Sequence, residues 1–94
     1  MDRSLQFYID GRWVDPVAPR AIDISDPATE TAIGRVSLGS AADVERAVAA
    51  ARAAFDAQSR TSTADRIALL QRISACYTER LDDLAAAISS EMGA

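Results

Sequence analysis

Cys76 is the one side chain of this sequence that could serve as a covalent thiol nucleophile. A thiol reacts as its thiolate, which needs a neighbouring base or cation, or the start of a helix, to stabilise it. The sequence contains no His and no Lys, and Cys76 falls in the middle of a helical pattern. We therefore expect Cys76 to be a small buried packing residue, and we expect no catalytic residue in the chain.

Carboxylates are the other groups that could do chemistry, as metal ligands or as a proton-transferring pair. Asp82 and Asp83 are adjacent, but they lack the alternating ligands and the glycine turn of a calcium loop. We interpret them as part of a solvated helix face. Arg66 differs from the other arginines, because it lies at the start of a predicted helix, where the helix dipole disfavours a cation. We expect Arg66 to have a specific partner.

The composition limits the classes of protein to which the chain can belong. Its 94 residues carry a formal charge of −4, with 49% hydrophobic and 26% charged side chains. An acidic chain binds nucleic acid poorly, because that affinity comes mainly from basic side chains on phosphates. No apolar run reaches the roughly 20 residues of a membrane span, and the first residues lack a secretory signal. With a single cysteine, these features predict a cytoplasmic protein that binds neither nucleic acid nor membrane.

The elements expected before Ser40 are two β-hairpins. Leu5 to Val14 has β-forming residues on both sides of Asp10-Gly11, a pair that favours the tight turn with positive φ at both positions. A second hairpin is predicted from residues 21–24 and 33–38. Between them, residues 26–29 have Asp at the first position and Pro at the second, as a type I turn prefers.

Ser40 begins the first predicted helix, with Asp43 completing a variant of the capping box. Apolar residues then recur at helical spacing and predict a core-facing stripe: Val44, Val48, Ala51 and Phe55. A second helix is predicted to start near Ser62 or Thr63, and its stripe is longer: Leu70, Ile73, Tyr77, Leu81, Leu84 and Ile88. Since that stripe exceeds most globular helices, we expect a break between Arg80 and Asp82. Gly93 is the expected C-cap.

The order of several short motifs resembles the N-terminal part of the aldehyde dehydrogenase superfamily. The matching stretches are Phe7–Val14, Asp26–Glu30 and Asp43–Phe55, followed by Arg66 and Leu70 at the family's spacing and by the ending Glu91-Met92-Gly93. The resemblance implies an α+β segment of an α/β fold. Its two hairpins would occupy residues 5–38 and its two or three helices residues 40–93. Residues 1–94 would then be a partial cofactor-binding domain.

The resemblance also implies the chemistry of a longer parent enzyme. Members of the family oxidise an aldehyde to the acid and pass a hydride to NAD or NADP, using Cys, Glu, Asn and Lys residues that lie downstream of the matched region. The chain has no Asn and no Lys, so it carries no catalytic and no cofactor-binding residue of the family. Some members bind a monovalent cation through backbone carbonyls that correspond to Ile24 and Ser25.

Two departures from the family pattern bear on packing. Asp26 stands where the family usually has Asn before Pro27, which is a mild change, because both residues favour turns. Gln58 stands where many members carry Trp, so this position lacks an aromatic anchor.

Two hypotheses about function follow. In the first, the chain is a catalytically silent N-terminal fragment of an NAD(P)-dependent aldehyde dehydrogenase, and its partner is the rest of that chain. In the alternative, it is a stand-alone interaction or self-association module. Under the first hypothesis the helix stripes carry more apolar surface than two short hairpins can cover, so we expect an exposed apolar patch and an oligomeric or loosely packed chain. For the fold, we expect Val44, Val48, Phe55, Leu70, Ile73 and Leu84 to be buried.

Overall fold

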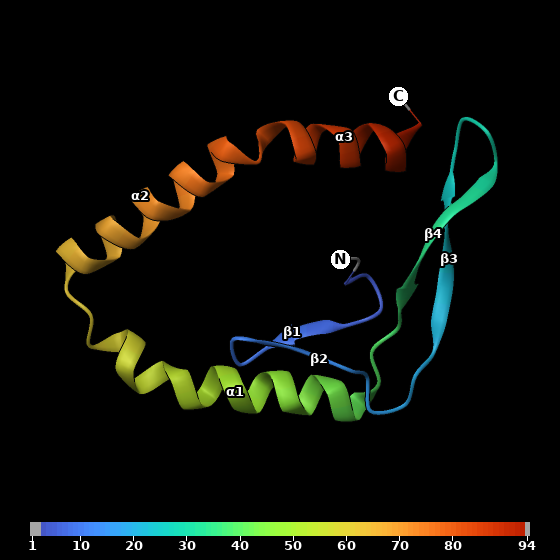
Figure 1. Cartoon of the computed structure of the whole chain (residues 1–94). Helices are drawn as coiled ribbons and strands as arrows, with labels where there is room; N and C mark the ends of the chain where they lie inside the picture. Colours follow the sequence, from blue (N-terminus) through green and yellow to red (C-terminus); the bar gives the residue numbers. More distant parts are fainter. Residues whose placement is uncertain (1–2, 94) are drawn as a thin grey trace.

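A computed structural model describes residues 3–93. Residues 1, 2 and 94 of the predicted segment 1–94 lie outside the described residues. The chain contains two antiparallel hairpins followed by three helices (Figure 1). The strands are β1 (Phe7–Ile9), β2 (Arg12–Val14), β3 (Ala21–Asp26) and β4 (Thr31–Ser37), and the helices are α1 (Ala41–Ser59), α2 (Thr63–Glu79) and α3 (Leu81–Met92). The predicted order of hairpins and helices is therefore confirmed.

The first hairpin turns at the predicted dipeptide. Asp10 and Gly11 have φ values of 55° and 72°, the left-handed geometry that matches the twist of the flanking strands. Tyr8 pairs with Trp13 across the hairpin, and their rings meet edge to face with centroids 5.3 Å apart. This aromatic pair stabilises a two-stranded ribbon that is otherwise short.

The second hairpin pairs β3 with β4 and contains a register shift between Ile24 and Ser25. Its turn closes one residue later than the predicted type I turn, because the Glu30 N–H donates to the Asp26 carbonyl at 2.7 Å. Glu30 accordingly has a φ of 58°. The Asp26 carboxylate accepts the Ala28 N–H at 2.8 Å, so Asp performs the turn-capping role expected of the family's Asn.

The helix boundaries follow local signals in the sequence. Ser40 caps α1 with a complete capping box, and the Ser62 side chain accepts the Asp65 N–H at the start of α2. Arg80 separates α2 from α3, which confirms the predicted break. Gly93 ends α3 in the left-handed conformation with a φ of 73°, as a C-terminal glycine allows.

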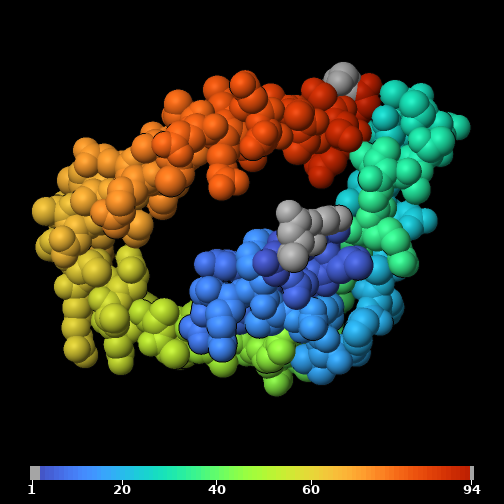
Figure 2. Space-filling view, in the orientation of Figure 1, coloured from blue at the N-terminus to red at the C-terminus, as the bar shows by residue number. Residues whose placement is uncertain are grey.

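The elements form an open ring rather than a packed domain. Figure 1 shows α2 and α3 running end to end along one side, opposite α1 and the first hairpin, and Figure 2 shows a gap through the middle. The ring closes where α3 meets β3. The radius of gyration is 17.0 Å, compared with about 12 Å for a compact chain of this length.

Among residues 3–93 no hydrophobic side chain is buried. The predicted burial of the two stripes is therefore wrong, because nothing in this chain packs on their outward faces: Val44, Val48, Phe55, Leu70, Ile73 and Leu84 are 40–64% exposed. A compact monomer of 10.0 kDa exposes about 5,200 Å², whereas this chain exposes 7603 Å². The exposed apolar surface expected from the sequence is thus present along the helices.

Candidate functional site

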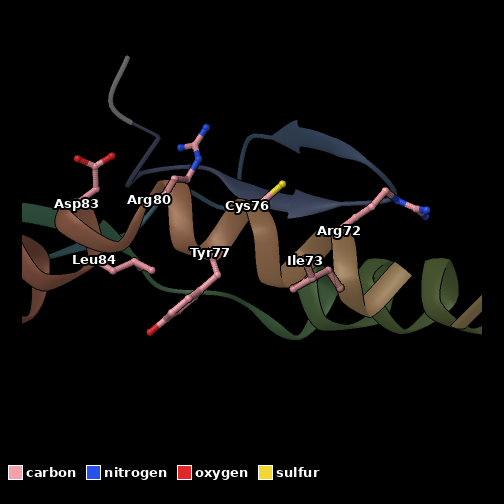
Figure 3. A pocket seen from close by; sticks show the side chains of 7 residues that line it. All are labelled: Arg72, Ile73, Cys76, Tyr77, Arg80, Asp83 and Leu84. Atoms are coloured by element: carbon pink, nitrogen blue, oxygen red, sulfur yellow. The ribbon is translucent and has the colours of Figure 1, made fainter. Parts of the chain in front are cut away.

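Cys76 lies in the middle of α2 and is exposed, so its predicted burial is wrong. It borders an open hollow of about 510 Å³ along α2 and α3 (Figure 3), whose lining residues are Arg72, Ile73, Cys76, Tyr77, Arg80, Asp83 and Leu84. The sequence supplies no imidazole that could activate the thiol. Figure 3 shows Ile73, Tyr77 and Leu84 on one side of the helices and the charged side chains on the other.

The carboxylates in the described part of the chain form no cluster that could hold a metal ion. Between residues 3 and 93, no group of three His, Cys, Asp or Glu side chains is placed to hold a metal ion. Asp82 and Asp83 lie in the first turn of α3, where their charge is favourable to the helix dipole. Within the same range, no helix has both the length and the apolarity to cross a membrane.

Asp43 is the one buried side chain among the described residues, with 3% of its surface exposed. Its carboxylate accepts the N–H and the hydroxyl of Ser40 and the N–H of Val17, each at 2.9 Å. The hydrogen bond from the Ser40 backbone, followed by that from Val17, lowers the pKa of Asp43 below its ordinary value. The Arg46 guanidinium adds an ion pair at 3.4 Å. The sequence predicted the Ser40 contact but gave no signal for Val17.

Arg66 has the specific partner expected from its position. From the first turn of α2 it reaches back to the end of α1, where its guanidinium donates to the Gln58 and Ser59 carbonyls at 3.2 and 3.3 Å. It also donates to the Thr61 hydroxyl at 2.9 Å. The last turn of α1 has no basic residue of its own, so Arg66 supplies the cation that a helix C-terminus favours. Gln58 thus contributes its carbonyl to the α1–α2 corner.

Ile24 and Ser25, the two residues whose carbonyls correspond to a cation site in the family, lie on either side of the register shift between β3 and β4. Ile24 pairs with Gly34 and Ser25 with Ala32, so the extra residue of this bulge is Ile33 on β4. Ile24 also borders a hollow between the second hairpin and α3, together with Gly34, Ala87 and Glu91. The structure brings the two predicted residues to the place where the ring closes.

Taken together, the described residues form helix caps and leave large hydrophobic side chains exposed along the helices. Residues 13–94 match the model of the aldehyde dehydrogenase family, and the chain therefore belongs to that family. The match covers most of β2 and every element after it.

Similar proteins share both the sequence and the fold of this region. A 3-succinoylsemialdehyde-pyridine dehydrogenase from a Pseudomonas species is 47% identical over 89 residues, which are 95% of this chain and 19% of that protein. Aldehyde dehydrogenase C from Pseudomonas syringae, solved as a mutant with NAD+ and octanal, is 51% identical, with a TM-score of 0.95 over 98% of this chain and 19% of that one. An aldehyde dehydrogenase from Bartonella henselae is 42% identical, with a TM-score of 0.92 over 95% of this chain and 19% of that one. The chain thus spans about a fifth of the length of these relatives.

Proposed function

We propose that this chain serves as the N-terminal segment of an NAD(P)-dependent aldehyde dehydrogenase, located in the cytoplasm. In that role it contributes structure to the cofactor-binding domain and no catalytic residue. The observation that carries the proposal is the family match over residues 13–94 combined with helix faces that this chain leaves uncovered. The rest of the enzyme would cover those faces.

The uncovered faces have the character of a domain interior. Val48 and Phe55 on α1 and Leu70 and Tyr77 on α2 are each about 60% exposed, and they belong to continuous stripes rather than scattered positions. Covering one such side chain contributes about 1.5–3 kcal/mol. Docking onto a larger body would therefore supply the packing energy that the open ring lacks.

The cofactor would bind outside this segment. A dinucleotide pyrophosphate is commonly held at a glycine-rich turn between a strand and the N-terminus of a helix. Here the turn from β4 to α1 contains a single glycine, Gly39, and the start of α1 already holds the Asp43 carboxylate. That negative charge opposes a phosphate, so the residues present do not fit the cofactor. The P. syringae relative that was solved with NAD+ and octanal supports NAD and an aldehyde for the complete enzyme.

The resemblance also supports a monovalent cation at the Ile24 and Ser25 carbonyls, which lie beside the register shift between β3 and β4. Sodium or potassium is bound by oxygen donors without a charged side chain being required. Such a cation would stabilise the bulge near α3 and take no part in the reaction. A sodium titration that shifts the amide resonances of these residues would support it, and the absence of any shift would exclude it.

A segment exchange tests the proposed function. The corresponding N-terminal segment of the P. syringae enzyme would be replaced by this chain, and reduction of NAD+ with octanal would be measured. We expect the chimera to be active, because the two segments are 51% identical with a TM-score of 0.95. A chimera carrying Val48→Asp should lose soluble enzyme, since a charge would enter the docked face. An inactive but folded chimera would contradict the proposal, as would a coding sequence after Ala94 unlike the family.

A further inference from the structure

We draw no further inference here: the strongest candidate, the hollow between the second hairpin and α3 that is lined by Ile24, Gly34 and Glu91, belongs to the cation site already proposed at the Ile24 and Ser25 carbonyls.

Discussion

The Asp43 carboxylate accepts the backbone N–H of Val17, which lies 26 residues earlier in the sequence, at 2.9 Å. Through this bond the first turn of α1 holds the link between the two hairpins. Arg46 strengthens the same junction by donating to the Asp15 carbonyl at 3.0 Å. The most buried group of the described chain is thus a carboxylate that joins the β and α halves.

This junction should weaken in acid. Because the pKa of Asp43 is lowered in the folded chain, its contribution to stability is present above the pKa of an unfolded Asp, about 3.9. That contribution is lost as the pH falls through the lower folded pKa. We expect Asp43→Asn to lower the thermal midpoint at neutral pH and to reduce the difference between neutral and acidic pH. The control is Glu45→Gln, which changes an exposed neighbour on α1. If both variants lowered the melting temperature measured by circular dichroism equally, Asp43 would not stabilise the junction as described.

Arg66→Ala should loosen the corner between α1 and α2. The variant removes three hydrogen bonds to residues 58–61. It also removes the cation at the C-terminus of α1, and the loss of that charge alone costs about 0.3–1 kcal/mol of stability. Hydrogen exchange should accelerate at amides 57–61 and remain unchanged in the first half of α1. Arg52→Ala, which changes an exposed arginine of α1, should not accelerate exchange at the corner. Unchanged exchange in Arg66→Ala would show that the loop holds the corner without this side chain.

Gly93→Ala should open the ring where α3 meets the second hairpin. An added Cβ would lie 2.8 Å from the Ala28 nitrogen, and the φ of +73° is strained for any side chain. The left-handed conformation alone costs about 1–2 kcal/mol. Gly34→Ala is the matched control, because its Cβ would meet only the Ile24 side chain at 3.9 Å. Faster hydrogen exchange in α3 for Gly93→Ala but not for Gly34→Ala is the expected result, and equal exchange in both would contradict the closing contact.

The sequence was informative where structure depends on neighbouring residues. The turn at Asp10-Gly11, the cap at Ser40 and the break at Arg80 each follow from local chemistry and were predicted. The Val17 contact of Asp43 was not, because a bond across 26 residues leaves no local signal.

The prediction that the helix stripes are buried was wrong for a different reason. Val48 and Leu70 lie on apolar stripes that predict a core, but a stripe indicates which face will be covered and not what will cover it. This chain lacks the covering surface, so both residues remain exposed. The same reasoning applies to Cys76, whose buried position was inferred from a stripe that has no partner here.

The 94-residue chain should catalyse no aldehyde oxidation by itself. Cys76 is exposed and could add reversibly to an aldehyde, but the resulting thiohemiacetal yields a thioester only if a hydride passes to a bound nicotinamide. The chain has no His, Lys or glycine-rich phosphate turn, and Asp43 occupies the start of α1. Incubation with NAD+ and octanal should therefore give no absorbance from reduced cofactor, for the wild type and for Cys76→Ser alike. Turnover in the wild type that Cys76→Ser abolishes would show that a reaction centre exists on α2.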